Sequence, residues 1–128
     1  MPFHSTLTRS AQFVRWRVSG PTSLENFVAL VDAIAAESTR RCDSKVMVDL
    51  RAVEGTLKFT DQFSVGEIVA LKLAHLVKLA SVVPAEQITR NSERVALRKG
   101  LLLRVFSREE EAAAWLTEPV STQDEGAR

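Results

Sequence analysis

Polar and apolar side chains alternate along residues 13–20, FVRWRVSG, in steps of two. This period is typical of a strand with one face in the core, and Gly20-Pro21 ends it. Residues 4–8, HSTLT, have a weaker strand pattern just before it. We expect the two segments to pair as a hairpin across RSAQ.

Three later segments have the composition of buried strands. They are KVMVDL at 45–50, LVKLASVV at 76–83 and LLLRVF at 101–106. Each is rich in branched apolar residues, and polar or turn-forming residues separate it from its neighbours. Residues 52–60, AVEGTLKFT, follow the first of them and are expected to be a loop of a length that often carries function.

Two long helices are predicted between these strands. The first, at 22–38, has one apolar stripe, and its start is capped either by Thr22, in a capping box with Glu25, or by Ser23. The second, at 60–75, begins at Thr60 or Asp61. The residues of this second helix that we expect to face inward are Phe63, Ile68 and Leu71, with Val69 as a further candidate.

Two shorter helices are predicted near the end of the chain. Residues 92–100, SERVALRKG, have basic residues in the last turn and Gly100 where a left-handed cap is easiest. Residues 107–116, SREEEAAAWL, begin with a capping box of Ser107 and Glu110. In this terminal helix Ala112, Trp115 and Leu116 are expected to pack on the sheet.

The order of elements is strand, strand, helix, strand, helix, strand, helix, strand, helix. Such alternation favours a mainly parallel sheet with right-handed crossovers. We therefore predict an α/β fold in which a five-stranded, mostly parallel sheet has one antiparallel edge strand and four helices mainly on one face. Residues 1–117 form the single predicted domain, and residues 118–128, which lack periodicity, are expected to be a disordered tail.

The strands alternate in character, as strands do when helices cover only one face of a sheet. We therefore expect the opposite face to be uncovered. The residues predicted on this face are Arg15, Arg17, Met47, Asp49, Lys78, Leu102, Arg104 and Phe106. Long basic side chains can keep such a face solvated, or arginine and aromatic residues can anchor a partner. We favour self-association through this face, which makes the protein a homo-oligomer.

Composition narrows the classes of function. The 128 residues are 45% apolar and carry a net charge of +1, so no overall field draws the protein to nucleic acid. The amino terminus lacks the apolar run of a signal peptide, and charged residues interrupt every long apolar stretch. A cytoplasmic protein without integral membrane contact is the expectation.

Residues with catalytic or metal-binding chemistry are sparse. His4 and His75 lack acidic or cysteine partners at a metal-ligand spacing, so neither a metal site nor another cofactor is predicted. Cys42 has no CxxC partner. Asp49 has nearby acids in the following loop, but salt bridging to Arg51 or Lys58 is the simpler account of these carboxylates. Trp16 and Trp115 are expected in the core.

Several segments together resemble a known family. VMVDLRAVEG, TDQFSVGE and SERVALRKGLLLRVFSREEEAAAWL resemble bacterial STAS-type proteins of the SpoIIAA-like fold, in the branch labelled STAS/SEC14-like. The most specific part is LRVFSREEEAAAWL, which is similar to a closing strand and helix of the pattern RVFxxxxEAxxWL. The resemblance covers residues 3 to 117 and implies the SpoIIAA-like fold.

The resemblance also suggests one candidate modification site. Better-known relatives are anti-sigma factor antagonists that are phosphorylated on a serine in an Asp-Ser-Ser/Thr-Gly motif at a helix start. The equivalent segment here is Phe63-Ser64-Val65-Gly66, which keeps only the spacing of the serine and the glycine. Ser64 is therefore a candidate phosphoacceptor or an ordinary first-turn residue.

Two functions remain open. The preferred hypothesis is a noncatalytic regulatory module that binds a protein partner or itself. The alternative, implied by the SEC14-like label, is a module that binds a lipid or another small molecule. A chain this short leaves little room for an enclosed lipid cavity beside its core. An enzyme ranks third, because no nucleophile and base are recognisable together.

Overall fold

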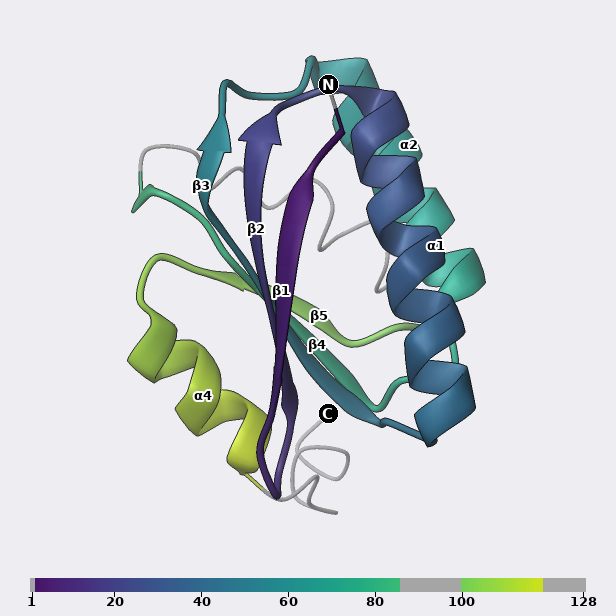
Figure 1. Cartoon of the computed structure of the whole chain (residues 1–128), viewed down its shortest axis with the longest axis vertical. Helices are drawn as coiled ribbons and strands as arrows, with labels where there is room; N and C mark the ends of the chain where they lie inside the picture. Colours follow the sequence, from purple (N-terminus) through teal and green to yellow (C-terminus); the bar gives the residue numbers. More distant parts are fainter. Residues whose placement is uncertain (1, 86–99, 119–128) are drawn as a thin grey trace.

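The computed structural model describes residues 2–85 and 100–118, and its five strands form one sheet in the order β1-β2-β3-β4-β5 (Figure 1). β1 pairs with β2 in antiparallel orientation, and the other neighbouring pairs are parallel. The strands are β1 (His4–Arg9), β2 (Val14–Pro21), β3 (Lys45–Glu54), β4 (Lys78–Val82) and β5 (Leu103–Phe106). The predicted mixed five-stranded sheet is confirmed.

Three helices occur in the described part of the chain: α1 (Leu24–Arg41), α2 (Phe59–Lys72) and α4 (Glu109–Thr117). Most of the helix predicted at 92–100 lies outside the described residues, so the structure contains three of the four predicted helices. Gly100 has a φ of 95°, a conformation that glycine adopts without strain. None of the described helices is both long enough and apolar enough to cross a membrane.

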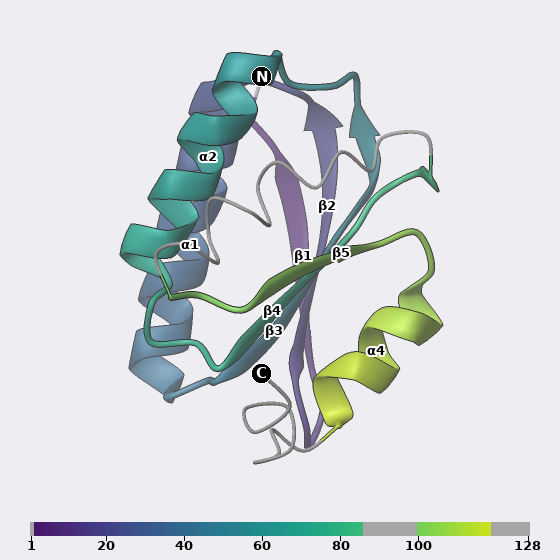
Figure 2. The ribbon, with the colours of Figure 1, turned by 180° about the vertical axis from the view of Figure 1, so that it is seen from behind.

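Helices cover both faces of the sheet. α1 and α2 lie side by side on one face, and α4 lies on the other (Figures 1 and 2). The prediction of a single covered face is therefore wrong. The prediction assumed that a face with charged residues stays uncovered. This face also has an apolar centre of Met47, Ala80 and Val82, which a short helix can cover.

The larger core lies between the sheet and the pair α1 and α2. The predicted division of each strand into two parities is confirmed, because Val14, Trp16 and Val18 of β2 all point into this core. Ile34 and Val31 supply the facing side of α1. Trp16 is 7% exposed and Trp115 is 9% exposed, so both tryptophans are core residues, on opposite faces of the sheet.

One predicted cap forms and one does not. Ser23, the second of the two residues predicted as the cap of α1, caps this helix, and its side chain accepts a hydrogen bond from the Asn26 backbone N–H at 3.0 Å. α4 begins at Glu109 after Arg108, so the capping box predicted at Ser107 does not form. Three glutamates occupy the first turn of α4 instead, where the helix dipole favours negative charge.

β3 is longer than predicted. Residues 52–54, expected in a loop, pair with β2 beyond a register shift between Arg17 and Ser19. The connection to α2 shrinks to residues 55–58, and Gly55 turns the chain there with a φ of 82°. The helix that follows begins at Phe59, and its Leu71 is 77% exposed, contrary to the expected inward position.

Candidate functional site

The sheet face predicted to be uncovered is the floor under α4. Met47 is 0% exposed, and Asp49 and Lys78 are each 3% exposed. Ala112, Trp115 and Leu116 of α4 form one apolar cluster with Met47, as expected of the terminal helix. The proposed self-association through an open sheet therefore loses its structural basis, and self-association itself stays a prediction.

Asp49 is ionised and fully partnered. Arg51 donates to its two carboxylate oxygens at 2.9 and 2.8 Å, and the Arg51 backbone N–H donates at 3.1 Å. Arg17 Nε approaches Oδ2 at 3.4 Å. Burial raises the pKa of Asp49, but the hydrogen bonds and charge of Arg51 together with the charge of Arg17 outweigh it, so the pKa is lowered. The predicted salt bridge to Arg51 is confirmed.

Lys78 is a buried cation that ties β4 to the end of α4. Its Nζ donates to the backbone oxygen of Trp115 at 2.6 Å and to that of Glu118 at 3.0 Å. These acceptors belong to the last turn of the helix, where carbonyls lack intrahelical partners and the dipole is negative. The ammonium also lies 4.9 Å from the centre of the Trp115 ring.

Glu109 holds the start of α4 against the sheet. Its carboxylate lies 2.7 Å from Arg15 Nε, 3.3 Å from an Arg17 guanidinium nitrogen and 3.0 Å from one of Arg51. Three guanidinium groups thus share Glu109 and Asp49. This arrangement fixes α4 at its first turn and Lys78 fixes it at its last, so the charged residues of this face act as attachments for the helix.

The remaining residues predicted on this face lie at its β5 edge. Leu102 and Arg104 are exposed and Phe106 is half-buried. Arg104 lies over both Phe106 and Trp115, at 5.7 and 5.8 Å from the ring centres. A role of these three residues in binding a partner stays a prediction.

Ser64 lies in the second turn of α2, counted from Phe59, and not in the first turn as predicted. The residue is half-buried, and its hydroxyl donates to the Thr60 carbonyl at 3.4 Å in an exposed contact. The unpaired N–H groups of the helix start belong to the preceding turn. A phosphate on Ser64 would therefore lie on the side of the helix and not at its start. Leu71 is one of the exposed residues on that side.

The other candidate residues have structural environments. His75 Nε2 lies 2.7 Å from the Ser38 hydroxyl, which itself donates to the Ile34 carbonyl and is buried, so this contact joins α1 to the chain after α2. Cys42 ends α1 in a left-handed conformation with a φ of 58°. Within residues 2–85 and 100–118, no group of three His, Cys, Asp or Glu residues is placed to hold a metal ion.

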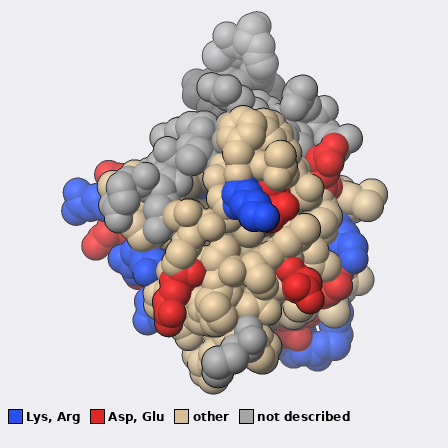
Figure 3. All heavy atoms as spheres, turned by 90° about the horizontal axis from the view of Figure 1, so that it is seen from above, with Lys and Arg blue, Asp and Glu red and all other residues tan. Residues whose placement is uncertain are grey.

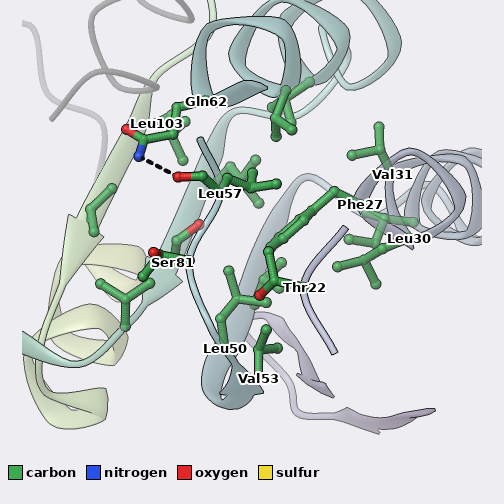
Figure 4. A pocket seen from close by; sticks show the side chains of 18 of the residues that line it. Thr22, Phe27, Leu30, Val31, Leu50, Val53, Leu57, Gln62, Ser81 and Leu103 are labelled. Atoms are coloured by element: carbon green, nitrogen blue, oxygen red, sulfur yellow. Dashed lines mark hydrogen bonds between the residues drawn. The ribbon is translucent and has the colours of Figure 1, made fainter. Parts of the chain in front are cut away.

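An apolar cavity of about 360 Å³ lies between the sheet and the helices α1 and α2. Figure 4 shows Phe27 and Leu30 of α1, Leu50 and Val53 of β3 and Ser81 of β4 on its wall. From the length of the chain we expected little room for an enclosed lipid cavity beside the core. No local pattern marks it, because its lining residues have the spacing of ordinary core positions.

The loop between β3 and α2 borders this cavity. Thr22 donates to the Gly55 carbonyl at 3.1 Å, and Gln62 donates to the Leu57 carbonyl at 3.2 Å (Figure 4). Figure 3 looks down on this end of the molecule, where residues other than Lys, Arg, Asp and Glu form most of the described surface.

Comparisons with known proteins support the fold. A crystal structure of an anti-sigma factor antagonist from Mycobacterium paratuberculosis is similar over 91% of this chain and 95% of that chain, with a TM-score of 0.65 and 18% identity. An uncharacterized protein with a SpoIIAA-like fold from Shewanella loihica is similar over 90% and 94%, with a TM-score of 0.55 and 14% identity. The fold is SpoIIAA-like. No family model and no curated protein matches the sequence.

Proposed function

We propose that this chain is a noncatalytic regulatory module that binds a protein partner through the outward side of α2. The observation that carries the proposal is the exposure of large apolar residues on this helix. Phe59 is 64% exposed and Leu71 is 77% exposed. Large apolar side chains on a helix surface are typical of protein contact sites when they lie together.

Phe59 and Leu71 lie near opposite ends of α2 and are connected by a row of residues at steps of four. Phe59 and Phe63 are one turn apart and their rings meet edge to face, 4.9 Å between centres. Continuing in steps of four leads past Glu67 to Leu71, so the exposed residues follow a single stripe. Ser64 lies seven residues before Leu71, on the same side of the helix.

The structural neighbours are consistent with this proposal. One of them is named as an anti-sigma factor antagonist, a name that describes action against another protein. In this chain a phosphate on Ser64 would add negative charge beside the apolar stripe and remove the hydroxyl donor that now bonds Thr60. Phosphorylation of Ser64 would thereby weaken an apolar contact.

The test is retention of a partner from lysate of the native host by the immobilised full chain and by Leu71→Glu. Loss of an apolar anchor costs about 1 to 3 kcal/mol, so we expect roughly tenfold weaker retention of the partner by Leu71→Glu. Val77→Glu is the matched control, because Val77 is also exposed, at 44%, but lies beyond the end of α2. Equal retention by all three proteins contradicts the proposal.

Ser64 is tested separately. Ser64→Asp should weaken retention of the same partner while the far-UV circular dichroism spectrum stays unchanged, and Ser64→Ala should retain it. A phosphoproteome of the native host that covers this peptide and never finds it modified would count against the switch, without affecting the binding surface.

A further inference from the structure

The cavity between the sheet and the pair α1 and α2 is an unusual space for a protein of this size. Interiors are close-packed, and voids larger than a water molecule are few in each domain. Here about 360 Å³ is unfilled, which is within the range of small-molecule sites. The lining comes from both helices and from β3, β4 and β5.

The chemistry of the lining is almost entirely apolar. Val48, Val65, Val69 and Leu103 are among the residues that surround the space, and no charged side chain of the described residues lines it. A buried ionic group without a partner is strongly unfavourable. The described part of the lining therefore selects against a molecule that must place a charge beside it.

Ser81 is the polar residue that the strands contribute to this lining. It lies on β4 opposite Val48 of β3 and Val105 of β5, in the apolar parity of the sheet (Figure 4). Its hydroxyl has no hydrogen-bond partner among the described residues, in contrast to Thr22 and Gln62, whose side chains bond the loop carbonyls. A hydroxyl in such surroundings has a donor and an acceptor to offer a bound molecule.

The loop after the carboxyl end of β3 forms part of the cavity wall. Gly55, Thr56 and Leu57 all line the cavity. The hydrogen bonds of Thr22 and Gln62 hold this loop in place, so the site is formed before anything binds.

We propose that the cavity binds an uncharged, mainly apolar small molecule of about 10 to 20 non-hydrogen atoms, with one polar group that hydrogen-bonds to Ser81. The site is separate from the proposed partner surface, because Val65 and Val69 line the cavity from α2 whereas Phe59 and Leu71 are absent from its lining. Ligand binding and partner binding can therefore fail independently.

The first experiment compares two fluorescent probes on the full chain. N-phenyl-1-naphthylamine is uncharged, and 8-anilino-1-naphthalenesulfonate has the same ring system with an added sulfonate. We expect the uncharged probe to bind about tenfold or more tightly than the sulfonate, because the sulfonate cannot enter without losing its hydration. No saturable binding of the uncharged probe, or equal binding of both probes, overturns the proposal.

The second experiment locates the bound probe. Val69→Phe fills part of the cavity and should weaken binding of the uncharged probe about tenfold. Leu71→Phe places the same ring on the exposed side of the same helix and should leave binding unchanged. Equal affinity of Val69→Phe and the native chain would place the probe elsewhere and overturn the site.

Ser81→Ala keeps the experiment informative if Val69→Phe fails to fold. Alanine removes only the hydroxyl of serine, so we expect a weaker bond to a probe with a hydroxyl, 1-naphthol, and unchanged binding of naphthalene. Equal loss for both probes, or no loss for either, contradicts the assigned role of Ser81. Cooperative thermal unfolding of the variant is the control for folding.

Discussion

The two faces of the sheet bury their apolar side chains in different ways. The face under α1 and α2 is wide, apolar and incompletely filled, with a cavity of about 360 Å³. The face under α4 is narrow and filled, with Met47, Ala80, Val82, Ala112 and Leu116 all at 0% exposure.

The difference lies in how each layer is held. On the wide face, many apolar contacts hold two long helices against the sheet. A cavity can therefore remain between them while the helices stay attached. A nine-residue helix has too little apolar surface for this, and short helices are marginal alone. α4 is therefore also bound by ionic contacts at both ends, through Glu109 and Lys78. A small covering layer thus needs charged attachments, whereas a large one tolerates a void.

The largest expected effect comes from the ring at the centre of the narrow face. Trp115→Ala should lower the free energy of unfolding by ~3 to 5 kcal/mol, because the ring is buried against Phe106 and under Lys78. Denaturant unfolding measures the loss. An unchanged midpoint would mean that α4 contributes nothing to the core.

Enlarging a side chain should change the free energy of unfolding differently on the two faces. Ala80→Val inserts volume into the filled face and should cost ~1 to 3 kcal/mol. Val65→Leu extends into the cavity and should be neutral or stabilising by less than about 1 kcal/mol. Thermal unfolding of the two variants side by side gives the comparison, and equal costs would show that the faces are packed alike.

The attachment at the end of α4 can be tested with a matched pair of lysines. Lys78→Met leaves the carbonyls of Trp115 and Glu118 without this donor, and we expect a loss of about 1 to 2 kcal/mol. Lys45 is the neighbour of Lys78 in the register of β3 and β4. Lys45→Met should cost less, and a larger loss for Lys45 than for Lys78 would contradict the attachment.

The smallest effect is a pH dependence at Asp49. Because its pKa is lowered in the folded protein, its ionised form stabilises the fold above the ordinary value of about 3.9. This contribution is lost as the pH falls from there through the folded pKa. Asp49→Asn should therefore be less dependent on pH below about 4 in urea unfolding. An unchanged acid profile would mean that other carboxylates account for it.

The fold was largely predictable because its signals are local. Alternation in β2 and the apolar stripe of α1 depend on residues within one element, and the strand order follows from the connections. The cap at Ser107 was wrong because a neighbouring residue can take the same place at little cost. The end of β3 was missed because its pairing with β2 is not local.

The sites were less predictable because they depend on distant partners. Asp49 and Lys78 looked like solvated residues, since isolated charges are rarely buried. The carbonyls of α4 that accept from Lys78 are remote in sequence and have no side-chain signal, whereas Arg51, the partner of Asp49, is close in sequence and was predicted. The cavity was missed for a different reason, because the same apolar residues could equally have filled it.

The position of α4 at the end of the fold has a consequence for synthesis. The ribosome makes the chain from the amino terminus, so β1 to β5 are synthesised before Trp115 and Leu116. In a chain that lacks α4, the apolar patch of Met47, Ala80 and Val82 has no helix over it. Exposed apolar surface of this kind promotes aggregation during folding and is the surface that chaperones bind. A chain released early, before α4, should therefore aggregate or remain bound to a chaperone, whereas the full-length chain covers the patch itself.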